Sequence, residues 1–242
     1  MSGWIKTWLK DHLPQKFVGR VEYHLEPERL DSWGGPLNGQ CFRQLMFVDL
    51  VQACRFGAIV ETGTFRGSST IFLAQNSGGV PVYSSEISAR YFTLAGRRLS
   101  PLPNVHLYNL DARQFLAALP LSHDTRTFFY LDAHWNQDLP LADETEFIIK
   151  TYRSFVIMID DFQVPGDAGY KFDDYGPGKS LSLRDFPFQD DSRIAAYFPA
   201  RHSSRESGIK RGCIVLVSQD MKSVVDSIDS LVAAANVSQN SH

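Results

Sequence analysis

Acidic residues recur where apolar segments of the sequence end. The five residues of this kind are Glu61, Glu86, Asp111, Asp132 and Asp160. Carboxylates can accept hydrogen bonds from hydroxyls and amines, hold a hard metal ion or take part in proton transfer. A single terminal acid could be a helix cap, but five in succession make capping an incomplete explanation. If the segments are parallel strands, the acids lie along the edge of the sheet where ligands bind.

The residues around Glu61 indicate what kind of ligand this is. Residues 58–60 are typical of a buried strand, Gly63 and Gly67 of a turn whose backbone lies close to a ligand, and Ser68 or its neighbour of a helix cap. A carboxylate directly before the first glycine would repel a pyrophosphate, but it suits a cofactor that carries an amino group and a sulfonium. The pattern therefore favours S-adenosylmethionine over a dinucleotide.

Short apolar segments alternate with amphipathic ones, which predicts a right-handed parallel sheet with helices on both faces. The predicted strands are residues 58–61, 80–86, 105–110, 127–132 and 155–160. The predicted helices are residues 42–53, 68–75, 89–99, 112–119 and 141–152. Further strands are expected at 213–217 and near 195–198, and a closing helix at 219–234.

The length of 242 residues suits one α/β domain with appended segments. We divide the chain into an N-terminal helical extension (1–35), the main domain (36–218) and a C-terminal helix and tail (219–242). Residues 163–199 are rich in Gly, Pro, Asp and aromatic side chains, which is typical of an acceptor-side lid or of a solvated connection.

Charge and composition limit the partners. A formal net charge of -3 gives no overall attraction to nucleic acid or to an anionic membrane, so a small-molecule substrate is expected. The three cysteines lack metal-type spacing and indicate a reduced, cytoplasmic protein. No apolar run approaches membrane-spanning length. A short helix with Trp4 and Trp8 on one side is expected to pack on the domain, on a second subunit in a homodimer, or on a membrane surface.

Five short motifs occur in order between residues 36 and 217, and together they resemble the class I S-adenosylmethionine-dependent methyltransferases. They are Val60-Glu-Thr-Gly-Thr-Phe-Arg-Gly67, Ser84-Ser-Glu86, Leu110-Asp-Ala112, Leu131-Asp-Ala-His134 and Ile159-Asp-Asp-Phe162. Within the class the chain is similar to the macrocin O-methyltransferase and catechol O-methyltransferase-like groups. The resemblance implies an α/β fold, a Rossmann-like, doubly wound, mostly parallel seven-stranded sheet with helices on both faces.

The resemblance also implies how the cofactor is held. Glu61, Gly63 and Thr64 would surround its methionyl part, while Gly67 and Ser68 complete the loop. Asp132 is a further cofactor-binding candidate. Glu86 would accept hydrogen bonds from the ribose hydroxyls. Asp111 and Ala112 would contact the adenine; Asp111 could also cap a helix, alone or together with that role. Asn38 and Gln40, before the helix at 42–53, are further candidates for cofactor contacts, or part of a simple turn.

The adjacent acids Asp132, Asp160 and Asp161 would repel one another unless a cation or protons neutralised them. The sequence therefore predicts a site for Mg²⁺ or another divalent cation, with a metal-free polar cleft as the alternative. In the catechol-like enzymes a metal at this place binds the acceptor hydroxyl and lowers its pKa, and the resemblance assigns that role here to these three aspartates.

His134 is the candidate general base beside Asp132, or else a hydrogen-bond partner that supports it. The chain has Trp135 where catechol-type enzymes carry a lysine, and an Asp-Asp pair in place of their Asp-Asn. The Asp-Asp pair and the histidine fit macrocin-like enzymes, which methylate sugar hydroxyls, better than they fit catechol-type enzymes. The predicted function is O-methylation of a hydroxyl on a sugar or natural product. The alternatives are an NAD(P)-dependent oxidoreductase and a non-catalytic S-adenosylmethionine-binding protein.

Overall fold

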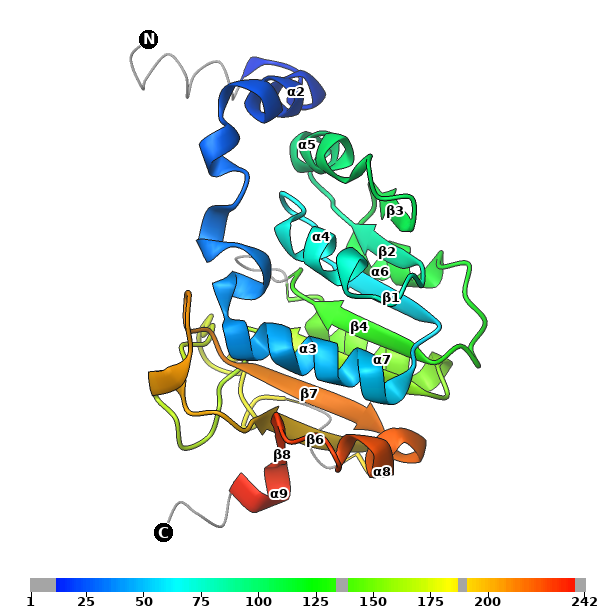
Figure 1. The fold of residues 1–242 in the computed structure, drawn as a ribbon, viewed down its shortest axis with the longest axis vertical. Helices are drawn as coiled ribbons and strands as arrows, with labels where there is room; N and C mark the ends of the chain where they lie inside the picture. Colours follow the sequence, from blue (N-terminus) through cyan, green and yellow to red (C-terminus); the bar gives the residue numbers. More distant parts are fainter. Residues whose placement is uncertain (1–11, 134–138, 187–190, 238–242) are drawn as a thin grey trace.

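The computed structural model describes residues 12–133, 139–186 and 191–237, and its centre is one mixed sheet (Figure 1). The strands lie in the order β3-β2-β1-β4-β5-β7-β6-β8. They are β1 (Ala58–Thr62), β2 (Val82–Ser85), β3 (Val105–Tyr108), β4 (Thr127–Leu131), β5 (Phe155–Asp160), β6 (Ile194–Pro199), β7 (Cys213–Ser218) and β8 (Leu231–Ala233). The pairs from β3 to β5 are parallel, and those from β5 to β8 are antiparallel. The predicted α/β, doubly wound and mostly parallel architecture is confirmed, but the sheet has eight strands and not seven.

The additional strand forms where the sequence predicted the closing helix. The chain instead makes a 3-10 turn (Gln219–Met221), a short helix α8 (Lys222–Val225) and then β8. Leu231 packs in the core on one side of the sheet and Val232 against the core on the other, which is the alternation of a strand. Pairing with Phe198 and Pro199 of β6 supplies the backbone partners. Apolar spacing alone fits both a helix and a strand, so tertiary pairing decided the outcome.

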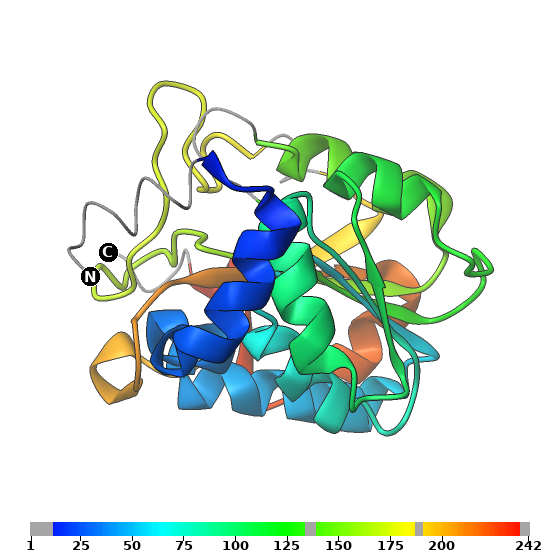
Figure 2. The ribbon, with the colours of Figure 1, turned by 90° about the horizontal axis from the view of Figure 1, so that it is seen from above.

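Helices cover both faces of the sheet, as Figure 2 shows from above. They are α2 (Gln15–Leu25), α3 (Cys41–Cys54), α4 (Ser68–Gln75), α5 (Ala89–Leu99), α6 (Ala112–Ala117), α7 (Leu141–Thr151) and α9 (Ala234–Val237), besides α8. Phe47 and Leu50 of α3 pack against the face that carries Phe128, and this face is called the α3 face below. Phe115 of α6 and Ile148 of α7 pack on the opposite face. None of the helices in the described ranges is long and apolar enough to cross a membrane.

The N-terminal part follows the outside of this sandwich. Helix α2 packs on α5 near the β3 edge of the sheet (Figure 1), where Glu22 forms an ion pair with Arg90. A side chain at Gly19 would collide with the Arg90 carbonyl, so the close helix contact requires glycine there. The predicted helix around Trp4 and Trp8 lies outside the described residues.

The register of the parallel strands places their carboxyl ends together. Thr62 is level with Ser85 of β2 and Leu131 of β4, and Leu131 is level with Ile159 of β5. The acids at or just after these ends therefore share one edge of the sheet, as predicted. Residues 163–186 are largely irregular with isolated bridges, whereas part of the predicted lid, near 195–198, is strand β6 as expected.

Candidate functional site

The loop between β1 and α4 curls tightly over the edge of the sheet. The backbone N–H groups of Gly63 and Thr64 both donate to the carbonyl of Ser85, at 3.1 and 2.9 Å. Gly63 and Gly67 have φ values of 90° and 81°, which favour glycine. A Cβ on Gly63 would also collide with the backbone carbonyl of Asp132. The first glycine is thus required because the end of β4 lies directly against the loop.

Glu61 lies beneath this loop and is fully buried. Its Oε2 accepts hydrogen bonds from the hydroxyls of Thr70 and Ser84, both at 2.5 Å. Its Oε1 has no hydrogen-bond partner among the described residues. Burial raises the pKa of Glu61 to about 7, against the opposing effect of the two hydroxyls. A cation near the loop would stabilise the ionised form of this carboxyl group.

Glu86 follows β2 and reaches back to the same loop. Its two carboxylate oxygens accept hydrogen bonds from the backbone N–H groups of Phe65, at 2.7 Å, and Ser88, at 2.8 Å. Burial raises the pKa of Glu86, while these two hydrogen bonds act in the opposite direction. Two of the roughly four acceptor positions of a carboxylate are used in this way, so the group retains capacity for hydroxyl donors.

The remaining predicted cofactor residues are placed in two different ways. Asp111 caps α6 by accepting a hydrogen bond from the N–H of Arg113 at 2.9 Å, so the capping alternative holds, and Ala112 is buried beside it. Ser68 is turned toward the N-terminal segment, where its hydroxyl donates to the carbonyl of Leu30 at 3.1 Å and to Asp31 at 3.0 Å. The Ser68 side chain therefore fastens that segment to the loop.

Asp160, at the end of β5, is surrounded by donors on the α3 face. It is 1% exposed and forms an ion pair with Arg43 of α3, which is equally buried. Its Oδ2 accepts hydrogen bonds from the Tyr130 hydroxyl at 2.6 Å and from the Asn38 amide at 2.9 Å. Its Oδ1, besides contacting Arg43, accepts the N–H of Asp161 at 2.8 Å. Four donors thus occupy the acceptor positions of this carboxylate.

The Tyr130 hydroxyl remains a donor in this cluster. Burial, together with the negative charge of Asp132, raises the pKa of Tyr130 well above its usual value. Tyr130 is level with Glu61 across the β1–β4 pair, so it lies between the two buried acids of the α3 face. A row of buried polar groups therefore crosses the carboxyl end of the sheet from β2 to β5.

Asp161 forms an ion pair with a second arginine, Arg211. It adopts a left-handed conformation, with φ of 55°, and accepts a hydrogen bond from Nε of Arg211 at 2.5 Å. The same guanidinium pairs with Asp173. Burial acts to lower the pKa of Arg211, but the two carboxylates raise this pKa overall, so the guanidinium stays protonated.

These contacts do not fit the predicted divalent cation at Asp132, Asp160 and Asp161. The oxygens of Asp160 already have four donors, and arginines supply the positive charge that the neighbouring aspartates need. Within residues 12–133, 139–186 and 191–237, no three His, Cys, Asp or Glu side chains are grouped so as to hold a metal ion. The prediction of a Mg²⁺ site on these three aspartates is not supported by this arrangement. His134 lies outside the described residues.

Comparison with known proteins identifies the fold. No family model and no curated protein sequence matches the chain. Among solved structures, the cofactor-bound Rv0187 from MTB aligns with a TM-score of 0.58 and 17% identity over 89% of this chain and 96% of that one. The O-methyltransferase from Bacillus cereus in complex with SAH aligns with a TM-score of 0.56 and 20% identity over 89% and 97%. The chain has the methyltransferase fold.

A third structure of this fold agrees with the first two. TomG, an O-methyltransferase from Streptomyces achromogenes involved in tomaymycin synthesis and in complex with SAM, aligns with a TM-score of 0.54 and 15% identity over 88% of this chain and 95% of that one. The aligned regions span nearly the full length of all three proteins. At these identities the likeness establishes the methyltransferase fold alone.

Three residues of the site were not predicted from the sequence, namely Arg43, Tyr130 and Arg211. Arg43 could have been found from the sequence, because its spacing places it on the same helix face as Met46, Phe47 and Leu50. An arginine on an apolar helix face needs a buried partner. Neither Tyr130, within an apolar strand, nor Arg211, between Lys210 and Gly212, stands out by its spacing in the sequence.

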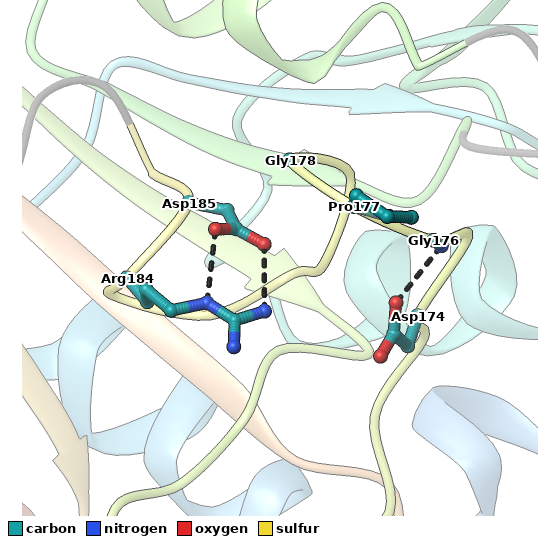
Figure 3. A pocket seen from close by; sticks show the side chains of 6 residues that line it. All are labelled: Asp174, Gly176, Pro177, Gly178, Arg184 and Asp185. Atoms are coloured by element: carbon teal, nitrogen blue, oxygen red, sulfur yellow. Dashed lines mark hydrogen bonds and ion pairs between the residues drawn. The ribbon is translucent and has the colours of Figure 1, made fainter.

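The predicted lid contains an open hollow of about 430 Å³ that Figure 3 shows from close by. It is lined by Asp174, Gly176, Pro177, Gly178, Arg184 and Asp185. Arg184 forms a two-pronged pair with Asp185, at 3.0 and 3.1 Å, and Asp174 accepts the N–H of Gly176 at 2.9 Å (Figure 3). Asp174, which lines the hollow, directly follows Asp173, and Asp173 forms an ion pair with Arg211.

Proposed function

We propose that the protein is an S-adenosylmethionine-dependent methyltransferase that transfers a methyl group to a hydroxyl oxygen of a small molecule, such as a sugar or another natural product. The observation that carries this proposal is the row of three acids that follow or end the neighbouring strands β1, β2 and β3. Glu61 lies beneath the β1–α4 loop, Glu86 binds the backbone of that loop, and Asp111 follows the next strand. Such surroundings favour a cofactor with a cationic amino acid part and hydroxyls, and disfavour a pyrophosphate.

The residues present fit this cofactor. The backbone of Gly63, Thr64 and Gly67 would line its methionyl part next to Asp132, and the unpartnered Oε1 of Glu61 marks where a nearby cation would stabilise the protein. Glu86 would accept from the ribose hydroxyls, and Asp111 with Ala112 would border the adenine. When bound, the cofactor supplies an activated methyl group. The chain has to orient the acceptor in line with that group and to take up one proton.

The acceptor side is assigned to the ends of β4 and β5 and to residues 163–186, the irregular part of the predicted lid that the structure describes. Asp132, and His134 outside the described residues, stay the candidates for proton removal. The names of the similar structures from Bacillus cereus and Streptomyces achromogenes support transfer to oxygen. The macrocin-like resemblance favours a sugar hydroxyl. A homodimer, a cytoplasmic location and the division at residues 35 and 218 stay predictions.

Two alternatives make different predictions about ligands. An NAD(P)-dependent oxidoreductase would need a pyrophosphate beside Glu61, and the loop lacks the third glycine of the usual dinucleotide fingerprint. A non-catalytic protein would bind S-adenosylmethionine without turning it over. Ligand binding distinguishes the first alternative from our proposal, and turnover distinguishes the second.

The first experiment is calorimetric titration of S-adenosylhomocysteine, NAD⁺ and NADP⁺ into the purified protein. We expect one S-adenosylhomocysteine per chain and no binding of the dinucleotides. Glu86→Gln should weaken that binding about tenfold, because a neutral amide accepts hydroxyl hydrogen bonds less strongly than a carboxylate. Glu146→Gln on α7, which changes an exposed acid paired with Lys150, should leave it unchanged. Dinucleotide binding instead would refute the proposal.

The second experiment tests turnover. Polyhydroxylated small molecules are incubated with the protein and S-adenosylmethionine, and formation of S-adenosylhomocysteine is measured. An acceptor-dependent product would support the enzyme. Tight cofactor binding without any acceptor-dependent product across sugars and phenols would favour the non-catalytic alternative.

A further inference from the structure

Two arginines neutralise the consecutive acids at the end of β5. Arg43 forms an ion pair with Asp160 and is as deeply buried as that carboxylate, whereas Arg211 forms an ion pair with Asp161 and is 21% exposed. The two acids are adjacent in the sequence and would otherwise repel each other. The chain thus already contains the positive charge for which a metal ion would be required.

The backbone of Arg211 is fixed by the start of α3. Its carbonyl accepts hydrogen bonds from the Gln40 amide at 3.0 Å and from the Arg43 guanidinium, and its N–H donates to Gln40 at 3.2 Å. The next residue, Gly212, donates to the carbonyl of Lys171 at 2.7 Å and has no room for a side chain against Phe162. The Arg211 side chain therefore leaves the backbone from a well-defined point.

From that point the guanidinium connects the sheet to the predicted lid. It contacts Asp161 through Nε and Asp173 through Nη2. Asp173 also donates its N–H to the Asp161 carbonyl at 3.0 Å and accepts the Tyr175 hydroxyl at 2.6 Å. The residues around this junction are only partly buried, so it lies at the surface of the acceptor side. Two carboxylates thus share there the cation of Arg211, which lies 50 and 38 residues from them in the sequence.

We infer that Arg211 takes the place of a divalent cation on the acceptor side of this site. The guanidinium joins Asp161 to Asp173, holds segment 171–181 against the carboxyl end of β5, and leaves the site independent of added metal. A guanidinium is charged throughout the physiological pH range, and its planar fork suits two carboxylates at once. The assignment of this edge to the acceptor rests on the proposed function, but the replacement of a cation by Arg211 does not.

The test uses Mn²⁺ as the probe and four forms of the full chain. These are the wild type, Arg211→Gln, Arg211→Lys and Arg184→Gln, the last removing a lid arginine that pairs with its sequence neighbour Asp185. The wild type, Arg211→Lys and Arg184→Gln should show no saturable Mn²⁺ binding by calorimetry. Arg211→Gln removes the shared cation, so it should bind Mn²⁺ at least about tenfold more tightly than the wild type. Adding Asp161→Asn should abolish the gain.

Amide hydrogen exchange tests the positioning role in the same proteins. Arg211→Gln should speed exchange of the amides in segment 171–181 by about tenfold, because the segment opens more often. Arg211→Lys should lie between it and the wild type, since a lysine makes one of the two contacts. Arg184→Gln should match the wild type. These readouts require a folded chain, which the unchanged exchange of the central strands verifies.

The two proposals fail in distinguishable ways. S-Adenosylhomocysteine affinity should be the same in the wild type and Arg211→Gln, because Arg211 contacts Asp161 and Asp173 rather than the β1–α4 loop. If none of the forms, including the wild type, binds S-adenosylhomocysteine, the proposed function is refuted and the Mn²⁺ result still stands. Stoichiometric Mn²⁺ binding by the wild type that is lost in Asp161→Asn would overturn the inference about Arg211. Unchanged exchange and unchanged Mn²⁺ binding in Arg211→Gln would overturn it too.

Discussion

At the scale of single residues, the site depends on acids whose charge is controlled by burial. Glu61 and Asp160 lie on the same face of the sheet and are almost equally buried, but their surroundings differ. Asp160 has a guanidinium and three further donors, which stabilise its ionised form. Glu61 accepts from two hydroxyls, and its pKa is raised by burial to about 7. A buried carboxylate stays ionised at low cost where a positive charge lies beside it.

The raised pKa of Glu61 predicts how stability changes with pH. The folded chain holds the Glu61 proton more tightly than the unfolded chain does, so this contribution is fully present below pH 4.5 and lost as the pH rises through about 7. The free energy of unfolding should fall by about 3 kcal/mol over this interval from Glu61 alone. Glu61→Gln should show a correspondingly flatter profile in urea unfolding between pH 5 and pH 8.

Glu146→Gln serves as the control, since this side chain is exposed and paired with Lys150 across one helical turn. Its profile should follow the wild type. A Glu61→Gln profile as steep as that of the wild type would contradict the raised pKa. Saturating S-adenosylhomocysteine should leave the wild-type profile steeper than S-adenosylmethionine does, because only the latter brings a sulfonium charge to the loop.

At the scale of elements, the β1–α4 loop is defined by contact with β4 and not by flexibility. Gly63 lies against the Asp132 carbonyl, and both of the first two loop amides donate to Ser85 of β2. The loop is therefore fixed by three adjacent strands before any ligand binds. Preorganisation of this kind reduces the conformational entropy that the loop loses when a ligand binds.

Substitution of this glycine should be costly for two reasons. Gly63→Ala introduces a Cβ at a positive φ and also pushes β1 away from β4, so it should destabilise the fold by about 2 kcal/mol or more and weaken S-adenosylhomocysteine binding. Gly78→Ala is the matched control, because Gly78 has φ of 70° but no heavy atom within 4 Å of the point where a Cβ would lie. Chemical unfolding and calorimetry measure both effects.

The control should lose about 1 kcal/mol, the strain of the left-handed conformation alone, and should bind the ligand normally. Equal losses in both variants would show that the contact with Asp132 has no cost of its own.

At the scale of the whole molecule, the sheet order brings the functional residues together. Strands β1 and β4 lie side by side in the middle of the sheet, with β2 and β3 on one side and β5 and β7 on the other. The β1–α4 loop and the Asp161–Arg211 pair consequently lie on opposite sides of the β1–β4 junction.

A ligand that binds the folded chain and not the unfolded chain should stabilise the whole fold. At a free concentration of 100 times its Kd, S-adenosylhomocysteine should add about 2.7 kcal/mol to the free energy of unfolding. This should raise Tm by roughly 5–10 °C for a chain of this size in differential scanning fluorimetry. EDTA should not reduce the shift, and NADP⁺ at equal concentration should produce none. A shift that disappears with EDTA would indicate a metal requirement that Arg211 does not satisfy.

The sequence by itself determined the type and position of most elements and the row of acids at the sheet edge. Helices α4 and α5 have the predicted bounds, because apolar spacing, a capping serine before α5 and the glycines before α4 are local signals. The ends of β1 and β5 were likewise readable, since an acid follows an apolar run in each. The carboxyl-edge position of Glu61, Glu86 and Asp160 follows from these elements.

Only the tertiary structure decided what neutralises the acids. Arg43 meets Asp160 across 117 residues of sequence and Arg211 meets Asp161 across 50, and no local pattern encodes such pairs. For the same reason the sequence could not reveal the arginines beside the aspartates for which it predicted a metal ion, and it predicted a helix where Leu231–Ala233 pairs with β6. Periodicity reports which side of a segment is apolar, whereas the partner of a charge or of a strand edge depends on which segments the fold brings together.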